Sequence, residues 1–288
     1  MNTSFSNLIP ESAKNFIRNF RDRKDLKKLE RTNVSVENLK KLDSDDEFEL
    51  IFNSEKYKSL WDSVSKELQG LDLPDNTGGV NTGDQRAIAY LIWHFKPSKI
   101  LEIGTHIGCS TVHLSVAQRE LKLVNGVSGI VTVDIRDVNS AEKPWIAYKA
   151  PMSPLDLVTK VNYSDKVIFR CQPSVEYLAQ CQDKYDLIFL DGGHSAELVY
   201  RELPLACRLL NRNGIILLHD YFPNNKPIWV NNSIIPGPYL ATERLIGEGC
   251  NIEIRPLGAL PWPTKQNSHY TSLALCTRGN INVTNYIP

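Results

Sequence analysis

The clearest pattern in the chain is a pair of short apolar runs separated by a helical repeat. The first run, 187–190, stops at Asp191, and the second, 215–218, stops just before His219 and Asp220. Apolar residues recur between the runs at roughly helical spacing: Leu198, Leu203, Leu205, Ala206, Leu209 and Leu210. This order predicts two consecutive parallel strands joined by a helix. Because ligands bind at the carboxyl edge of open α/β sheets, we expect both aspartates to lie near a site.

The same alternation of strands and helices extends over residues 98–220. Short apolar runs at 99–103, 129–134 and 166–171 predict three more strands. The expected helices cover residues 87–95, a stretch from about Ser110, 154–161 with Ser153 as N-cap, 175–182 and 240–246. Two final strands, 251–255 and 271–278, have no helix between them and should form an antiparallel hairpin at the sheet edge. The chain is therefore expected to be an α/β protein with a doubly wound sheet.

Residues 1–77 differ from the rest of the chain because they are polar and dense in charge. We expect a helical extension or lid over 1–77, including a helix at 55–71, followed by the main domain over 78–288. An intermittent apolar face is predicted to pack on the main domain or on a second subunit: Phe16, Ile17, Phe20, Leu26 and Leu29. The alternative is a basic helix that touches an anionic surface, which the interspersed acidic residues disfavour.

Composition narrows the class of protein. With 288 residues and 42% hydrophobic content, the chain is long enough to bury a large core. The formal net charge is +0, whereas nucleic-acid binders usually carry a basic excess, so we expect no nucleic-acid partner. Six scattered cysteines without a CxxC pair predict reduced thiols. No apolar run reaches the length of a membrane span, and no signal-like apolar region opens the chain, so we expect a cytoplasmic protein.

A glycine-containing loop, 102–108, follows the first strand of the main domain. Gly104 and Gly108 allow a tight turn and a close approach to a ligand. Asp134, at the end of the next strand, can accept hydrogen bonds from two ribose hydroxyls. These residues predict a nucleotide or nucleoside cofactor. Glu102 places a carboxylate beside the turn, which suits a cationic sulfonium nucleoside better than a pyrophosphate at a helix N-terminus.

The segment ILEIGTHIGCST resembles the first motif of class I S-adenosylmethionine-dependent methyltransferases. It is most similar to that of the metal-dependent catechol and caffeoyl-CoA O-methyltransferases and their natural-product and sugar relatives. The resemblance runs in order through four motifs over residues 78–222, and it implies a Rossmann-like sheet of seven strands, mostly parallel with an antiparallel C-terminal strand. It also implies S-adenosylmethionine as the cofactor, bound by Glu102, Gly104, Thr105, Gly108, Ser110, Asp134, Ser174 and Asp191.

The same resemblance implies that Asp191 and Asp220 are ligands of Mg²⁺ or another divalent cation. Carboxylate oxygens are the hard ligands that magnesium takes. His194 stands where catechol-type enzymes carry a basic residue, and a histidine can accept a hydroxyl proton near neutral pH. The alternative is that His194 and Ser195 only cap the following helix. Strand alternation places His219 on the opposite face from Asp220, so we expect it to be a packed histidine.

One residue departs from the pattern of that group. Tyr221 stands directly after the second aspartate, where catechol-type enzymes usually have an asparagine as third metal ligand. Either another group, such as Asp137 or Glu202, completes the site, or the site has lost its metal.

The function we expect is methyl transfer from S-adenosylmethionine to a hydroxyl oxygen of a small-molecule acceptor, such as a natural product or secondary metabolite. Aromatic side chains in the surrounding loops suit a ring-containing or apolar acceptor: Trp145, Tyr148, Trp229, Tyr239, Trp262, His269 and Tyr270. The alternatives are a metal-independent methyltransferase acting on oxygen, nitrogen or carbon, and a non-catalytic scaffold. A nicotinamide enzyme is disfavoured by the glycine spacing. A homodimer or higher homo-oligomer is left open.

Overall fold

A single seven-stranded sheet forms the centre of the computed structural model, which describes residues 10–42, 44, 46–74, 77, 79–123, 128–140, 144–265 and 268–279. The strand order is β3-β2-β1-β4-β5-β7-β6. The strands are β1 (Lys99–Ile103), β2 (Gly129–Asp134), β3 (Val167–Cys171), β4 (Tyr185–Leu190), β5 (Leu210–Leu218), β6 (Ile252–Pro256) and β7 (Ala274–Arg278). The pairs among β1 to β5 are parallel, and β7 is antiparallel to both of its neighbours. This confirms the predicted sheet, including its antiparallel C-terminal strand.

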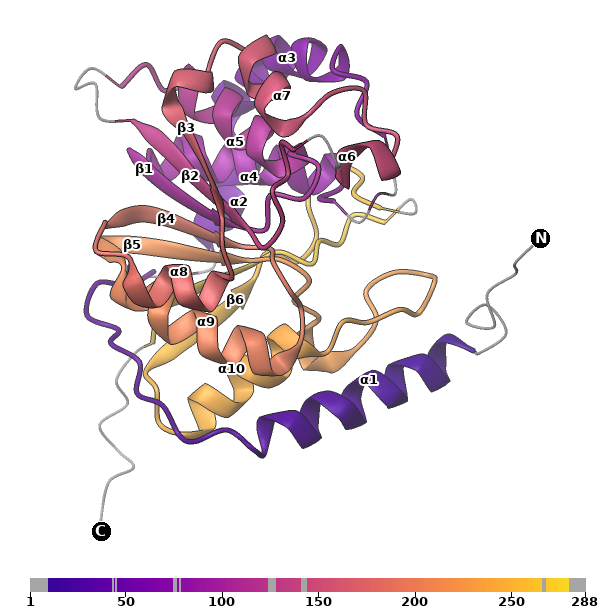
Figure 1. The fold of residues 1–288 in the computed structure, drawn as a ribbon, viewed down its shortest axis with the longest axis vertical. Helices are drawn as coiled ribbons and strands as arrows, with labels where there is room; N and C mark the ends of the chain where they lie inside the picture. Colours follow the sequence, from indigo (N-terminus) through magenta and orange to yellow (C-terminus); the bar gives the residue numbers. More distant parts are fainter. Residues whose placement is uncertain are drawn as a thin grey trace.

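Helices cover both faces of the sheet (Figure 1). One face carries α2 (Asp46–Phe52), α3 (Glu55–Gln69), α4 (Thr82–Phe95), α5 (Cys109–Glu120) and α7 (Pro154–Lys160). The other carries α8 (Ser174–Gln180), α9 (Ala196–Arg208) and α10 (Gly237–Gly247). The short α6 (Pro144–Ala147) lies near the carboxyl edge, and α1 (Glu11–Leu26) runs along α9 and α10 (Figure 1). The layers are those of a doubly wound fold.

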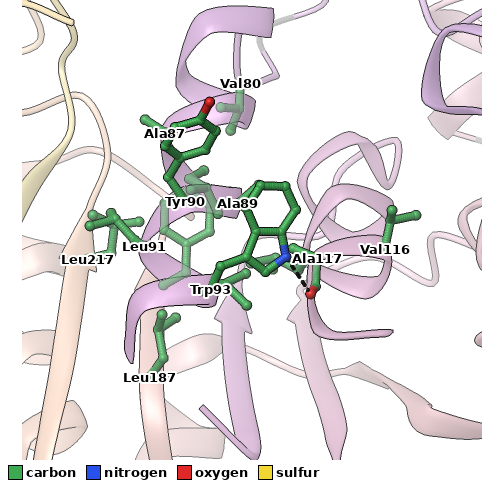
Figure 2. Close-up of a cluster of buried hydrophobic side chains, with 14 of the residues drawn as sticks. Val80, Ala87, Ala89, Tyr90, Leu91, Trp93, Val116, Ala117, Leu187 and Leu217 are labelled. Carbon is green, nitrogen blue, oxygen red and sulfur yellow. Dashed lines mark hydrogen bonds between the residues drawn. The ribbon is translucent and has the colours of Figure 1, made fainter. Parts of the chain in front are cut away.

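Alternation along each central strand divides the core into two layers. In β4, Leu187 and Phe189 face the α4–α5 layer, while Ile188 and Leu190 face the α9–α10 layer. All four side chains are at most 5% exposed. Figure 2 shows the first layer, where Tyr90, Trp93 and neighbouring apolar side chains of α4 meet α5 and the sheet. The Trp93 indole N–H donates to the Ala117 carbonyl at 3.0 Å, which satisfies its polar atom within this layer.

The predicted helices of the main domain are all present, with ends shifted by a few residues. Ser153 caps α7 in a capping box with Asp156, as its position predicted. The strand predicted at 215–218 is longer in the structure, because β5 begins at Leu210 and pairs with Tyr185 across a register shift. Gly214 lies inside this strand, where its N–H donates to the Asn38 carbonyl and its carbonyl accepts the Lys40 N–H.

The helix α1 packs only part of its predicted apolar face on the main domain, and packing of the rest on a second subunit stays a prediction. Leu26 is buried, but Phe16, Ile17 and Phe20 are 71%, 56% and 64% exposed, so most of the expected apolar face does not pack on the main domain. Polar contacts hold the helix instead: Arg18 donates to the Ile234 carbonyl at 3.2 Å. The helix α2 was not predicted, because it begins within the acidic run 43–49. The division of the chain at 77/78 stays a prediction, and residue 78 lies outside the described part.

All six cysteines are free thiols, as predicted. In the described part of the chain, no helix has both the length and the apolar character that crossing a membrane requires.

The two-layer core makes a prediction about stability. Replacement of the fully buried Phe189 by alanine should lower the free energy of unfolding by about 3–5 kcal/mol, because it removes apolar contacts in the central strand and leaves a cavity. Phe20→Ala is the matched control, since a 64% exposed ring on α1 should contribute within about 0.5 kcal/mol. Urea unfolding followed by circular dichroism measures both. Equal losses in the two variants would contradict the layer assignment.

Candidate functional site

The glycine loop between β1 and α5 is shaped by close contacts within the protein. Gly104 has φ +101°, and a Cβ on it would lie 2.1 Å from the Asp191 carbonyl oxygen. Gly108 has φ +81°, and a Cβ on it would lie 2.8 Å from Pro154. Both values of φ favour glycine, and both positions lack space for a side chain. The two glycines therefore bring the loop against the end of β4 and the start of α7.

A cavity of about 480 Å³ opens at the carboxyl edge of the sheet, where the strand order reverses between β1 and β4. This is the position at which doubly wound folds bind ligands. The predicted site residues that line it are Gly104, Thr105, Ser110, Asp134, Ser174, Asp191 and His194. Gly108 and Glu102 are not among the lining residues. The sequence thus placed most of its expected cofactor-binding residues around one cavity.

Asp134 lies at the end of β2 and fixes the surrounding loops. One carboxylate oxygen accepts the His106 backbone N–H at 2.9 Å, and the other accepts the Arg136 backbone N–H at 2.9 Å. The Arg136 side chain also donates to it at 3.2 Å. Each carboxylate oxygen has two lone pairs, so Asp134 retains acceptor capacity towards the cavity.

Glu102 lies beneath the glycine loop and is completely buried. One of its oxygens accepts hydrogen bonds from Thr111 at 2.5 Å and from Thr132 at 2.6 Å. The other has no hydrogen-bond partner within the described residues. Burial raises the pKa of Glu102 to about 7, against the hydrogen bonds, which lower it. Glu102 therefore does not contact a ligand in the cavity directly, and any electrostatic effect on a cationic ligand would act through the glycine loop.

Two aspartates and a histidine meet where β4 and β5 end. The Asp191 N–H donates to the Ile103 carbonyl and the His219 N–H to the Leu190 carbonyl, so the sheet register sets both positions. His219 Nδ1 lies 2.8 Å from Asp191 Oδ1 and 3.7 Å from Asp220 Oδ2. One potential ligand atom from each of the three residues lies within 4.8 Å of the others.

The position of His219 corrects the sequence prediction. The ring is buried, as expected for a packed histidine, but it does not point away from Asp220. Strand alternation fails here because β5 ends at Leu218 and Asp220 adopts a left-handed conformation with φ +53°. Burial by itself lowers the pKa of His219, but the charges of Asp191 and Asp220 outweigh it and raise this pKa well above its usual range.

His194 lies at the border between the cavity and this cluster. Its Nε2 is 3.4 Å from Asp220 Oδ2, and its side chain is 32% exposed. The N-cap of α9 is Ser195, whose hydroxyl accepts the Leu198 N–H, so His194 itself does not cap the helix. A Cβ on Gly237 would lie 1.9 Å from the His194 carbonyl oxygen, which shows how closely α10 packs against this loop.

The other candidates for a third metal ligand lie elsewhere. Tyr221 is 5% exposed and packs in the α9–α10 layer beside Tyr239. Asp137 is exposed and accepts the Asn139 N–H. Glu202 is fully buried below Gly192 and does not belong to the group formed by Asp191, His219 and Asp220. The sequence analysis treated His219 as a packed histidine and missed its place between Asp191 and Asp220. Its position directly before Asp220 was the available signal.

The aromatic residues expected to surround a substrate divide into two groups. Trp229 and Trp262 are buried, and their indole N–H groups donate to the Tyr270 and Gly83 carbonyls, so they hold loops in place. Tyr148 is 40% exposed, and its ring lies 4.5 Å from that of His106, which lines the cavity. The exposed ring of Tyr148 is therefore accessible beside the cavity, whereas the two buried tryptophans are not.

Residues 101–221 match a family model described as a methyltransferase domain. This stretch runs from β1 to Tyr221 and contains the glycine loop, Asp134, Asp191 and Asp220. The chain is also 28% identical over 125 residues to O-methyltransferase hkm8 from Aspergillus hancockii. That alignment covers 43% of this chain and 43% of the relative. The chain thus spans less than half the length of the curated relative that it matches.

Solved structures show the same fold. A cofactor-bound protein from MTB superposes with a TM-score of 0.51 and 16% identity over 82% of this chain and 96% of that chain. An O-methyltransferase from Bacillus cereus in complex with SAH gives a TM-score of 0.50 and 16% identity, over 76% and 90% of the two chains. These likenesses show the fold, and the domain match confirms the predicted resemblance to methyltransferases.

The burial of Glu102 predicts how stability depends on pH. Its pKa in the folded chain, about 7, lies above the ordinary value of 4.5, so the folded state holds this proton more tightly than the unfolded state. Stability is therefore lost as pH rises between these values. Glu102→Gln removes the titration while keeping an oxygen acceptor. We expect the variant to gain on the order of 3 kcal/mol relative to the parent between pH 4.5 and pH 8. A constant difference in unfolding free energy across that range would contradict this account.

Proposed function

We propose that this chain, which carries a methyltransferase domain on a class I methyltransferase fold, transfers a methyl group from S-adenosylmethionine to a hydroxyl oxygen. The acceptor is a small molecule, of the natural-product or secondary-metabolite kind. His194 acts as the general base, and Asp191 and Asp220 hold a divalent cation such as Mg²⁺. The observation that carries the proposal is the convergence of His194 and Asp220, 3.4 Å apart, at the border of the cavity that Asp191 lines.

The cavity fits a nucleoside cofactor along one wall. Its volume of about 480 Å³ lies within the range of small-ligand sites. Asp134 keeps acceptor capacity for ribose hydroxyls, and Ser174 lies at the first turn of α8 on the side suited to adenine. The carboxylates of Asp134 and Asp191, which line the cavity, make this region negative, which favours a ligand that carries a sulfonium and an ammonium group. S-adenosylmethionine supplies the electrophilic methyl group.

The group formed by Asp191, His219 and Asp220, called the strand-end cluster below, fits a divalent cation. Asp191 and Asp220 offer carboxylate oxygens of low exposure, and a third donor lies within 4.8 Å. Magnesium often takes only one or two protein carboxylates and fills its other positions with water or substrate oxygen. A divalent cation bound there would lower the pKa of a coordinated hydroxyl group.

The residues of the chain then perform two tasks. The cavity wall and the strand ends align the acceptor oxygen with the methyl carbon, which is a proximity and orientation effect. As the oxygen forms its bond to the methyl carbon and the carbon–sulfur bond breaks, His194 Nε2 accepts the hydroxyl proton. Asp220, 3.4 Å from that nitrogen, stabilises the resulting imidazolium. The products are a methyl ether and S-adenosylhomocysteine.

The base assignment is tested by His194→Ala. Removal of the proton acceptor should lower turnover by about 10²–10⁴-fold at neutral pH, because general-base catalysis contributes on that order. Formation of S-adenosylhomocysteine with a panel of phenols, sugars and alcohols measures turnover. Calorimetry should find cofactor affinity nearly unchanged.

The matched control for that experiment is His94→Ala. His94 lies on the surface of α4 and pairs with Glu47 of α2. The variant should leave both turnover and cofactor affinity unchanged. Turnover by His194→Ala within threefold of the parent would show that another group removes the proton.

The metal role is tested by chelation. Thorough removal of divalent ions should lower turnover more than about tenfold, with recovery on adding back Mg²⁺ or Mn²⁺, because the hydroxyl would lose its activating cation. Cofactor binding, followed by calorimetry, should persist. Full turnover after chelation would instead support a metal-independent enzyme on the same fold.

A further inference from the structure

The strand-end cluster contains more negative charge than its neighbours balance. Three carboxylates surround His219: Asp84 from α4, Asp191 and Asp220. Asp84 is completely buried, and the exposed fractions of the other two side chains are 9% and 14%. Within the described residues, the ion pairs of these carboxylates involve histidines only, and none involves lysine or arginine. Buried carboxylates need pairing or a metal, so this arrangement favours a cation.

The two ring nitrogens of His219 face different groups. Nδ1 lies 2.8 Å from Asp191 Oδ1 and 3.7 Å from Asp220 Oδ2, on the side of the proposed ion. Nε2 lies 3.6 Å from Asp84 Oδ2, on the side of α4. Ligands at adjacent octahedral positions about 2.1 Å from an ion are about 3 Å apart, which is close to the spacing of Nδ1 and the Asp191 oxygen.

Asp84 is held in place by its own helix. It lies in the first turn of α4, where its backbone N–H donates to the Asn81 side chain at 3.0 Å. The Asn81 amide in turn donates to Asp84 Oδ2 at 2.6 Å, and the positive end of the helix dipole favours a carboxylate there. Asp84 Oδ1 and His219 Nε2 are both buried without a hydrogen bond among the described residues. Buried polar groups usually have partners, and the Asp84 carboxylate approaches Nε2 through its other oxygen, Oδ2, at 3.6 Å.

We propose that His219 Nδ1 is the third protein ligand of the ion and that Asp84 is a positioning residue that accepts a hydrogen bond from Nε2. The imidazole takes the part that asparagine plays in the catechol-type group, whose position is occupied here by the buried Tyr221. A carboxylate behind a metal-binding histidine fixes its tautomer and ring orientation. This inference rests on the proposed function, because it needs the ion held by Asp191 and Asp220.

The ligand set determines which ion is preferred. Imidazole nitrogen suits transition ions, whereas carboxylate and water oxygens suit Mg²⁺. A site with two carboxylates and one imidazole should therefore bind Mn²⁺ or Co²⁺ more tightly than Mg²⁺. The preference should exceed that of a site in which all protein ligands are oxygens.

The test uses Mn²⁺ binding by the full chain without acceptor. Calorimetry should give one tight Mn²⁺ site per chain, and the electron spin echo of bound Mn²⁺ should show coupling to a directly bound ¹⁴N. His219→Asn replaces the nitrogen ligand by an amide oxygen. It should abolish the ¹⁴N coupling and lower the ratio of Mn²⁺ to Mg²⁺ affinity by about tenfold. His194→Ala should retain the coupling, which shows that the nitrogen does not come from the base.

Asp84→Asn separates positioning from folding. It should keep the ¹⁴N coupling but weaken Mn²⁺ binding by about 10–100-fold, because loss of the supporting carboxylate loosens the imidazole. His94→Ala is the control for histidine loss elsewhere and should bind Mn²⁺ like the parent chain. Thermal unfolding checks that each variant is folded.

The outcomes distinguish three failures. If the parent chain binds no Mn²⁺ or Mg²⁺, the metal part of the proposed function is wrong. If it binds one ion per chain without ¹⁴N coupling, and His219→Asn binds equally well, the ion site stands and the role of His219 is wrong. Unchanged Mn²⁺ affinity in folded Asp84→Asn would overturn the positioning role of Asp84 alone.

Discussion

The close approach of the Gly104 backbone to the Asp191 carbonyl is the contact on which the site depends. A Cβ on Gly104 would lie 2.1 Å from that oxygen, so the glycine loop can rest directly on the end of β4. The register between β1 and β4 continues into this contact, since the Asp191 N–H donates to the Ile103 carbonyl at 2.9 Å. Asp191 both lines the cavity and belongs to the cluster with His219 and Asp220. The sheet register thereby fixes where the cavity and this cluster meet.

Four carboxylates of low exposure at this edge of the sheet are compensated in different ways. Glu102 accepts threonine hydrogen bonds and has a raised pKa, which reduces its charge near neutral pH. Asp84 is supported by the first turn of α4 and by Asn81. Asp191 and Asp220 share His219 between them. A protein without ligands would gain stability by replacing such groups with apolar residues, so their presence points to binding cationic ligands.

Segments outside the matched methyltransferase domain pack against the residues at the carboxyl edge of the sheet. The start of α10 packs so closely on the His194 backbone that only Gly237 fits there. Asp84 belongs to α4, which precedes the domain match, yet it reaches the strand-end cluster. The helix α1 runs along α9 and α10 and leaves the ring of Phe20 exposed. Segments on both sides of the matched domain therefore contact the residues at this edge of the sheet.

The sequence alone determined the sheet, its mostly parallel order and the cofactor loop, because hydrophobic periodicity and glycine positions are local signals. It also located Asp134, Asp191 and His194, since strand ends in a parallel sheet meet at one edge. Only the tertiary structure decided where His219 points, because that depends on the left-handed backbone of Asp220 rather than on strand alternation. Likewise, Asp84 in helix α4 lies near His219, directly after strand β5, across a long sequence separation, and only the packing of α4 on the sheet brings them together.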